Sequence, residues 1–393
     1  MNRAKISKKI PVRLLATVPQ AEIPVEGAAS AIPLPTGPHG GQREAALRFG
    51  PYLEAVHHML AKDDYRKLLK GLRSRLNRVV AVEEIDWLEI RTEKHGACYH
   101  VARIQVSVAG QQTPFAVNVA AIPEAREQLE REFRLLMLLN ARYKNKTLPN
   151  VYFKGAGLYR EKGKPVKWLH MFVAEWLRGY HEFHLHRDDR RGSNRMLLWD
   201  MDKGAHYISQ RECFELYRQA ARILTLYYNY HNFRQIYPWH HAAGDFVIKA
   251  KKGKIHIRLI TIRDYSAVVD FSSRKRAAKL LGLIIFFLHL TVQMRVDRLD
   301  GVGQVVWAED HCLEGTVTGF LDGWAERKKQ IRKEIPSVGE VRDLLRRFSK
   351  DEWLHFLVEM LGSYTFSQEE VSLLRYHGNA HIDCLMRLLT SGV

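Results

Sequence analysis

The sequence predicts an α+β protein, with a small antiparallel sheet lobe followed by a mostly helical lobe. Residues 85–178 hold several segments that alternate or run β-branched, which is typical of strands. From residue 274 onward the apolar residues recur mostly at helical spacing. The chain has 393 residues, 46% of them hydrophobic, which is enough for two or three domains or one large two-lobed unit.

The first 84 residues precede the sheet lobe and divide into two parts. Residues 1–43 are rich in Pro, Ala and Gly, a composition that favours a flexible lead-in. Residues 44–84 carry apolar side chains at helical spacing as far as about residue 77, which predicts a helical extension of one or two amphipathic helices.

The sheet lobe is expected over residues 85–178 as three strands, a helix and two strands. Acidic residues follow Pro123, as a helix N-terminus prefers. The strands are predicted at 87–91, 99–108, 115–120, 148–153 and 167–176, and the helix at 123–143.

The helical lobe is expected over residues 179–393. Its first part, to about residue 203, is polar and predicts a loop-like stretch in which His184 and His186 are structural rather than metal ligands. A hairpin with a basic turn at 251–254 is expected within the lobe. Helices are predicted at 212–230, 274–295, 311–332, 338–347, 350–361 and 367–390.

The chain is strongly basic, with a formal net charge of +18. Such a surface favours anionic partners, namely nucleic acid, phosphorylated substrates or an anionic membrane face, although a merely solvated basic surface fits equally well. Residues 66–78 and 327–333 are the most basic stretches. Zinc-finger spacing, an aromatic RNA-binding signature and a helix-turn-helix pattern are absent from the sequence, so charge alone predicts only nonspecific, salt-sensitive binding of nucleic acid.

Cysteine usage and hydropathy indicate a cytoplasmic protein, with peripheral membrane contact left open. The four cysteines are scattered, which argues against a disulfide framework and suits a reducing compartment. The N-terminus does not have the apolar core of a secretory signal. The longest apolar run, 280–290, is short for a membrane span and predicts a buried helix.

The most informative segment runs from Tyr237 to Lys249 and continues, after the basic turn, to Ile260-Thr-Ile-Arg-Asp-Tyr265. Asp245 and Asp264 stand at the ends of two strands that are expected to pair, and His240-His241 lies just upstream. Two carboxylates with a nearby proton acceptor are what magnesium-assisted phosphoryl transfer requires.

The order of these features resembles the protein-kinase-like superfamily over roughly residues 85–390. The nearest branch is that of aminoglycoside and choline phosphotransferases and of sugar or lipopolysaccharide kinases. The resemblance implies a two-lobed fold that binds ATP and Mg²⁺ and transfers a phosphoryl group to a hydroxyl of a small molecule, sugar or glycolipid. Only about ten residues separate Asp264 from the next helix, which argues against a regulated protein kinase with a long activation segment.

The resemblance assigns roles in the helical lobe, with one departure. Asp245 stands where the family has a metal-binding Asn, and Asp264 matches the Asp of the family's Asp-Phe-Gly-like element, so both are expected to bind Mg²⁺. The family's catalytic Asp is replaced by His240, whose neutral imidazole could accept a hydroxyl proton.

The sheet lobe departs further from the family pattern. Asn118 occupies the position of the phosphate-gripping lysine, and Glu132 matches the helix glutamate that pairs with that lysine. Arg103 on the neighbouring strand is the candidate for the missing positive charge. Gly96 is the one glycine kept in the loop over the phosphates, and Glu175 lies in a segment that resembles the hinge along the adenine edge.

Three functions therefore remain open from the sequence. The first is an active phosphotransferase with His240 as base. The second is a pseudokinase that binds a nucleotide or a partner without turnover, and the third is a basic nucleic-acid-binding protein. A purely structural interpretation also stands, in which Trp239 is buried in a packed turn and Asp245 and Asp264 are capping or ion-pair residues. The acceptor and the oligomeric state are not determined.

Overall fold

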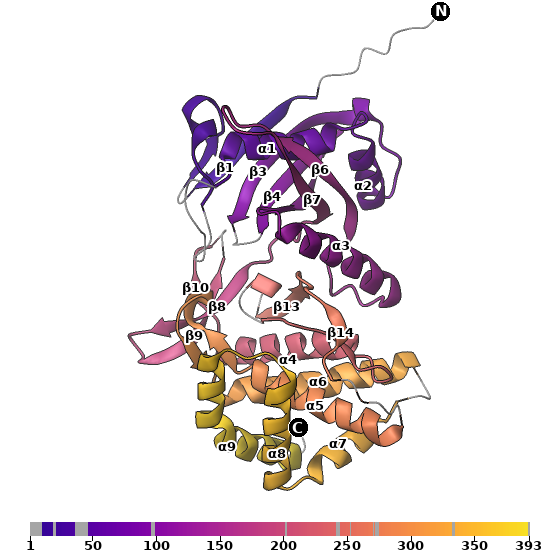
Figure 1. Ribbon diagram of the computed structural model, residues 1–393, viewed down its shortest axis with the longest axis vertical. Helices are drawn as coiled ribbons and strands as arrows, with labels where there is room; N and C mark the ends of the chain where they lie inside the picture. Colours follow the sequence, from indigo (N-terminus) through magenta and orange to yellow (C-terminus); the bar gives the residue numbers. More distant parts are fainter. Residues whose placement is uncertain are drawn as a thin grey trace, which may run out of the picture. The chain divides into compact units, whose positions relative to one another are not determined.

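The computed structural model describes residues 10–18, 21–35, 46–95, 99–200, 203–240, 244–251, 253–269, 271, 275–331 and 335–391. The chain divides into two compact units. The first, here the sheet unit, comprises Met1–Arg142 and Pro149–Leu177. The second, here the helical unit, comprises Tyr143–Leu148 and Arg178–Val393. The protein is of the α+β class, as expected (Figure 1).

The sheet unit is built on one seven-stranded sheet with the order β2-β1-β3-β4-β5-β7-β6. The strands are β1 (Val12–Val18), β2 (Ala21–Pro24), β3 (Ile85–His95), β4 (Tyr99–Val108), β5 (Gln111–Ala120), β6 (Val151–Tyr159) and β7 (Lys167–Glu175). The five strands expected in this unit all form, and their neighbouring pairs are antiparallel. The turn between β4 and β5 falls at Ala109 and Gly110, whose φ angles of 49° and 78° lie in the left-handed region.

Two strands lie where a flexible lead-in was expected, which corrects that expectation for residues 12–24. β1 pairs in parallel with β3, so the sheet is mixed rather than purely antiparallel. Thr17 donates its backbone N–H to the Thr92 hydroxyl at 2.9 Å, and its own hydroxyl donates to the Thr92 carbonyl at 2.6 Å. These two hydrogen bonds help to hold β1 against β3, although the Pro- and Ala-rich composition of the segment did not predict a strand. Residues 1–9, 19–20 and 36–43 of the lead-in lie outside the described residues.

The helical extension packs on one face of this sheet and forms its core. It consists of α1 (Phe49–Ala61) and α2 (Arg66–Leu76), as expected. Alternate residues of the strands, such as Ile90, Ile104 and Val117, are fully buried in a cluster with Leu53 and Val56 of α1. A β-carbon at Gly157 would lie 1.7 Å from the Ala55 carbonyl oxygen, so α1 approaches β6 closely only because that position is glycine.

Helix α3 (Ala125–Arg142) agrees with the predicted helix and contacts β5, β6 and β7. Phe133 of α3 lies 5.7 Å, ring centre to ring centre, from Phe172 of β7. Met171 and Val173, which flank Phe172, point instead into the core beneath α1. Because successive strand residues point to opposite faces, α3 covers the face of β7 opposite to α1.

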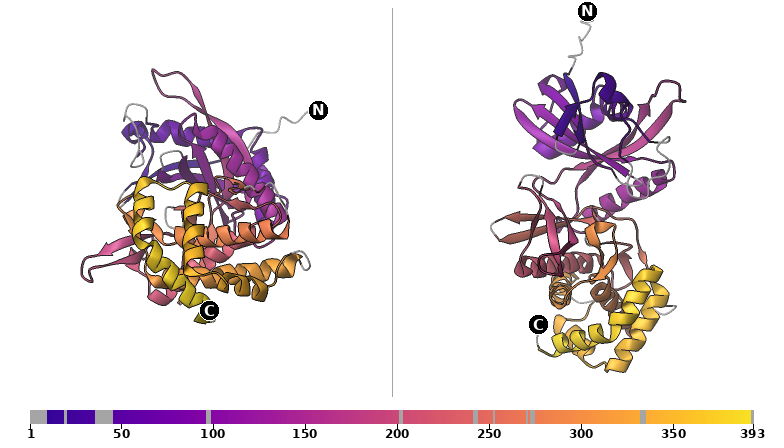
Figure 2. Two further views of the ribbon diagram at one scale, coloured as in Figure 1. Left: turned by 60° about the horizontal axis from the view of Figure 1, so that its bottom comes forward. Right: turned by 90° about the vertical axis from the view of Figure 1, so that its left-hand side faces the viewer.

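Six helices of the helical unit match the predicted ranges closely, and α4 and α6 form its largest helix contact. The matched helices are α4 (Gln210–Tyr227), α5 (Arg276–Gln293), α6 (Asp310–Ile331), α7 (Val338–Arg346), α8 (Lys350–Ser363) and α9 (Gln368–Ser391); Figure 2 shows them from two further sides. Ser209, Ser337 and Ser349 start α4, α7 and α8 with capping boxes, each closed by a glutamate three residues later. Glycines at 315, 319 and 323 of α6 face the carbonyls of Phe214, Arg218 and Arg222 on α4, where a β-carbon would clash.

Short antiparallel pairs accompany these helices. β8 (Glu182–Asp188) and β9 (Ser193–Trp199) form a hairpin, with β10 (His206–Tyr207) beside β9, where a loop-like stretch was expected. The stretch is polar because only alternate residues, such as Phe183 and Leu185, are buried. The predicted basic hairpin is β12 (Phe246–Lys251) with β13 (Lys254–Leu259). β11 (Arg234–Ile236) pairs with β14 (Tyr265–Ala267), and β15 (Val296–Arg298) pairs with β16 (Val305–Trp307).

Helix α5 contains the longest apolar run of the sequence. Among the described residues it alone is long and apolar enough to cross a membrane, and 67% of that window is buried inside the protein. The residues from Gly282 to Gln293 are all buried. The prediction that residues 280–290 form a buried helix is therefore confirmed.

Candidate functional site

The best-defined polar site of the helical unit is centred on Asp245, which is only 1% exposed. Both terminal nitrogens of Arg263 donate to its carboxylate, Nη1 to Oδ2 and Nη2 to Oδ1, the latter at 2.8 Å. The backbone N–H of His240 donates to Oδ2 at 2.8 Å. Two donated bonds in parallel from one guanidinium form the strongest and most directional kind of carboxylate contact.

Two strand pairings bring these residues together. β12 and β13 pair from Phe246 opposite Leu259, and the backbone N–H of Ile260 donates to the Asp245 carbonyl at 2.7 Å. β11 and β14 pair from Ile236 opposite Tyr265, and the backbone N–H of Tyr237 donates to the Asp264 carbonyl at 3.3 Å. The segment with Arg263 is therefore held between the hairpin and β11, and it places the guanidinium at the start of β12.

A magnesium ion does not fit the described surroundings of Asp245. Both carboxylate oxygens already accept hydrogen bonds, and the guanidinium supplies the positive charge that a cation would otherwise bring. A metal ligated here would have to displace Arg263 and leave that cation without its carboxylate. Within the described ranges, no group of three or more His, Cys, Asp and Glu side chains is arranged to hold a metal ion.

The other expected ligand, Asp264, is half-buried and locally bonded. The hydroxyl of Ser266, two residues on, donates to its Oδ2 at 2.6 Å. Its backbone carbonyl anchors Tyr237 of the loop that follows β11. The Asp264 backbone carbonyl therefore joins the two segments, and its carboxylate accepts a local hydrogen bond.

His240, expected as a base, contributes its backbone to the site and exposes its side chain. Its neighbour His241 lies outside the described residues. Trp239 is buried, as the packed-turn interpretation predicts, with its ring centre 6.0 Å from that of His289.

The loop after β11 lies on an aromatic cluster that sequence analysis did not identify. His289 of α5 stacks on Tyr364 with ring centres 3.6 Å apart, and Tyr237 meets both rings edge-on. Gln235 donates to the Tyr364 hydroxyl at 2.9 Å. Burial lowers the pKa of His289 to about 3, so this imidazole stays neutral and acts as a flat packing surface. Nothing in the local sequence around His289 signals this role, because its ring partners come from the loop after β11 and from the residue after α8.

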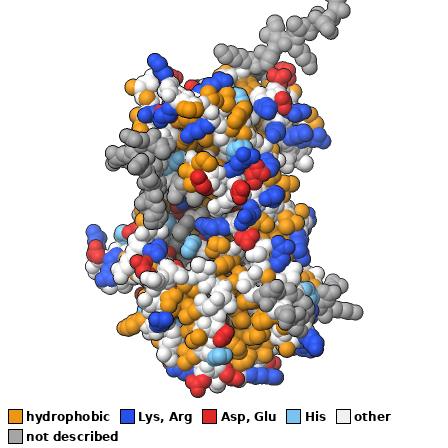
Figure 3. Space-filling model, viewed as in Figure 1, with side chains coloured by type: hydrophobic (Ala, Val, Ile, Leu, Met, Phe, Trp, Pro, Cys, Tyr) orange, Lys and Arg blue, Asp and Glu red, His pale blue; other side chains and the backbone are white. Residues whose placement is uncertain are grey.

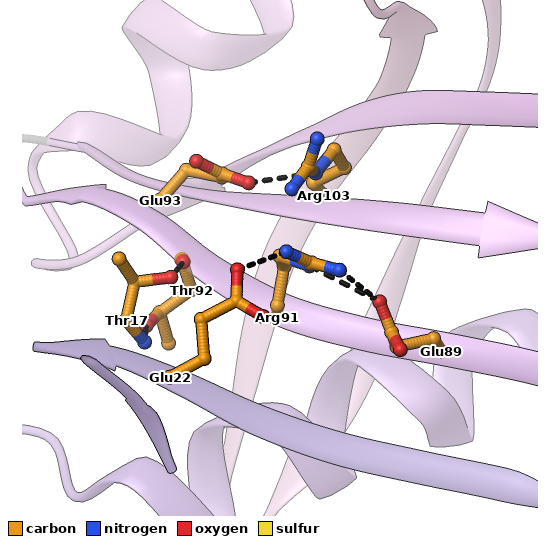
Figure 4. A network of polar contacts seen from close by, with 7 residues as sticks. All are labelled: Thr17, Glu22, Glu89, Arg91, Thr92, Glu93 and Arg103. Carbon is orange, nitrogen blue, oxygen red and sulfur yellow. Dashed lines mark hydrogen bonds and ion pairs between the residues drawn. The ribbon is translucent and has the colours of Figure 1, made fainter. Parts of the chain in front are cut away.

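The candidate cation of the sheet unit, Arg103, is engaged within its own sheet (Figure 4). Its Nε lies 2.7 Å from a carboxylate oxygen of Glu93 on β3, and its guanidinium lies 5.0 Å from the ring centre of Trp176. Burial raises the pKa of Glu93 despite the attraction of Arg103. Beside this pair, Arg91 is held by Glu89 and Glu22. Along β3 the side chains Glu89, Arg91 and Glu93 therefore alternate in charge, and Arg91 stands opposite Arg103 of β4.

The remaining predicted residues of the sheet unit are distributed as follows. Asn118 of β5 pairs in register with Val101 of β4 and so shares the face of Arg103. Glu132 is buried on α3, at 3% exposure. Glu175 accepts from Arg75 at 3.2 Å and from the Asn150 side chain at 3.0 Å, and its backbone N–H donates to the Asn150 carbonyl at 2.8 Å. Gly96 lies outside the described residues.

Basic side chains are spread within each unit rather than gathered into one stripe on the face that Figure 3 shows. Several of them are neutralised locally, as Lys154 is by Glu130 and Lys350 by Asp383, each at 2.8 Å. On this face the described basic side chains therefore do not form the continuous basic track of a nucleic-acid-binding groove.

No protein-family model matches the chain, and no curated protein matches it.

The residue that sequence analysis missed is Arg263. It directly precedes Asp264 in the connection between β13 and β14, after the apolar residues Ile260 and Ile262, and a charged side chain in such surroundings needs a partner. That signal indicates a buried ion pair but does not name the partner, which stands 18 residues earlier.

Proposed function

We propose that this protein is a kinase-like binding protein that does not transfer phosphoryl groups. The observation that carries the proposal is the two-point contact of Arg263 with the buried carboxylate of Asp245. In the phosphotransferases that the sequence resembles, this position binds Mg²⁺. Here a guanidinium, which is permanently charged, stands in for the metal.

The sheet unit supports the same conclusion. Asn118 brings no charge to the position of the phosphate-gripping lysine. Arg103, the substitute cation, is paired with Glu93 and stacked on Trp176, so using it for catalysis would leave a half-buried carboxylate without its partner. Because phosphoryl transfer depends mainly on electrostatic stabilisation, loss of both the metal ligand and the lysine removes its principal sources.

The test is a paired measurement of turnover and binding. The purified protein and an Asp264→Ala variant are incubated with ATP, Mg²⁺ and hydroxyl acceptors (aminoglycosides, choline, sugars), and released ADP is followed. Thermal unfolding is recorded with ATP in the presence and absence of Mg²⁺. We expect turnover at the level of the variant and no stabilisation that requires Mg²⁺. Turnover or Mg²⁺-dependent stabilisation that disappears in Asp264→Ala would establish the active phosphotransferase instead.

A further inference from the structure

A cavity of about 370 Å³ lies in the sheet unit, where the turn between α1 and α2 and the start of α3 approach β6 and β7. Its walls include Lys62, Lys67, Arg126, Gly155, Trp168 and His170. A volume of this size suits a small organic molecule rather than a single ion. The cavity shares no residue with the predicted phosphoryl-transfer site.

The charge in the cavity is positive. Lys62, Lys67 and Arg126 line it together with a single carboxylate, Asp63. That carboxylate accepts from Arg66 at 2.8 Å, so it does not neutralise the three lining cations.

Local contacts orient one of these cations. The Nζ of Lys67 donates to the Lys154 carbonyl at 2.8 Å, which fixes the ammonium at the edge of β6 while leaving it two further protons to donate. The Lys154 side chain is itself paired with Glu130 at 2.8 Å. Glu130 also interacts electrostatically with Arg126 and His170 of the wall, so it offsets part but not all of the positive charge of the three cations.

The shape of the cavity depends on small residues of β6. A β-carbon at Gly155 would lie 2.8 Å from Cγ of Met59, so a larger residue would drive Met59 into the space. Ala156, the next residue, is the only other β6 residue on the wall. The cavity is therefore kept open by the two smallest residue types at the point where α1 approaches the strand.

The rim carries an aromatic plane and an imidazole. Trp168 is 55% exposed, an unusual position for a large apolar side chain, and His58 meets it edge-on at 5.9 Å between ring centres. His170, which stands opposite Ala156 in the β6–β7 register, has its pKa lowered by burial and by Arg126. It is thus neutral near pH 7 and able both to donate and to accept a hydrogen bond.

We propose that this cavity binds a small phosphomonoester, with the phosphate between Lys62, Lys67 and Arg126 and a planar group of the ligand against Trp168. A phosphate dianion matches the excess of positive charge, and it accepts charge-assisted hydrogen bonds from both lysine and arginine. Aromatic stacking explains why a tryptophan is exposed beside the cations. The same phosphomonoester could be part of a free metabolite or of a lipid headgroup.

The test is titration calorimetry of the full chain with AMP, inorganic phosphate and adenosine. We expect AMP to bind more tightly than phosphate, and adenosine not to bind measurably. In a Lys62→Ala/Arg126→Ala variant the affinity for AMP should fall at least tenfold, since two charge-assisted contacts are lost. An Arg160→Ala/Lys162→Ala variant removes the same charge from exposed positions of the same unit and should bind as the parent does. Trp168→Ala should reduce the affinity for AMP to that for phosphate.

Vesicles distinguish the two sources of the phosphomonoester. Sedimentation with phosphatidic acid in phosphatidylcholine, lost in Lys62→Ala/Arg126→Ala and retained in the control variant, would assign the site to a lipid headgroup, whereas binding of AMP alone assigns it to a free metabolite. The proposal is overturned if neither ligand binds, or if both double variants weaken binding equally. Equal affinities for AMP and phosphate would remove the stacking role of Trp168.

Discussion

Arg263, which lies between β13 and β14, holds at two points the carboxylate of Asp245, which directly precedes β12 and was expected to bind a metal. The carboxylate is buried, with a side chain only 2% exposed, whereas the guanidinium is 30% exposed. The ion pair thus joins a buried carboxylate to a guanidinium that remains partly exposed to solvent. The contribution of this ion pair to the free energy of unfolding can be measured, and the proposed function rests on the same contact.

Loss of Arg263 should be strongly destabilising. Arg263→Ala leaves the buried Asp245 charge without its partner, and we expect the free energy of unfolding to fall by about 3 kcal/mol. The double variant Arg263→Ala/Asp245→Ala should lose less than the single one, because no uncompensated charge remains. Urea unfolding of the two single variants and the double variant measures this coupling. Additive losses would mean that the contact contributes nothing.

The contact between α4 and α6 should not tolerate a side chain at position 319. Gly319→Ala places a β-carbon about 2.0 Å from the Arg218 carbonyl oxygen, so the helices must separate. We expect a loss of about 1–3 kcal/mol by urea unfolding. Gly362→Ala in α8 is the matched control, because nothing lies within 4 Å of its added carbon. That variant should be neutral or slightly more stable, since alanine favours helix over glycine. Equal effects at the two positions would contradict the close packing.

Acidification should destabilise the protein partly through His289. Its folded pKa of about 3 lies below the ordinary value of 6.5, so the unfolded chain binds the proton more readily between these values. This contribution to stability is fully present above pH 6.5 and is lost as the pH falls toward 3, by about 1.4 kcal/mol per pH unit.

The contribution of His289 is isolated by comparison with His289→Phe, which keeps a ring against Tyr364 but cannot be protonated. Between pH 6 and 4 the free energy of unfolding of the parent should fall more steeply with pH than that of the variant. The difference in slope should correspond to about one proton taken up on unfolding. His381, also buried and with its pKa lowered to about 3, is present in both proteins and cancels in the difference. Parallel pH profiles would show that His289 does not titrate in this way.

Binding of nucleic acid should be weak and dominated by salt. The net charge of +18 supports association with arbitrary DNA or RNA at low ionic strength, but the basic side chains do not form a continuous track on the face described. We expect affinity to fall by orders of magnitude between 50 and 200 mM salt, without preference for sequence. Gel-shift titrations at several salt concentrations measure this, and tight binding that persists at high salt would favour the nucleic-acid-binding alternative.

Most helices and the five central strands of the sheet unit could be predicted, whereas two kinds of strand could not. β1 and β2 were hidden by a Pro- and Ala-rich composition, and they form because β3 offers β1 a partner. β8 and β9 were hidden by polarity, because half of their residues face outward. In both cases strand formation depends on a partner segment, which local composition does not report.

The candidate site shows the same division. The sequence placed Asp245 and Asp264 at the ends of two paired strands, with His240 just upstream. In the structure Asp245 directly precedes β12 and Asp264 directly precedes β14, but β12 pairs with β13 and β14 pairs with β11. The sequence could not show that Arg263 would turn toward Asp245, or that the carboxylate would be buried. Those outcomes depend on the pairing of β11 with β14 and of β12 with β13 together.

The sequence by itself determined where most helices and the five central strands of the sheet unit lie, because apolar periodicity and capping residues act within a few positions of the chain. It also determined that the protein is basic and that residue 118, where the resemblance expects a lysine, is the uncharged Asn118. Only the tertiary structure decided which charges meet, with Arg263 on Asp245, Arg103 on Glu93, and three cations left around the cavity beside Trp168. The physical reason is that a charge must find its partner across space when it leaves water, and the choice of partner is made by strand register and helix packing rather than by neighbours in sequence.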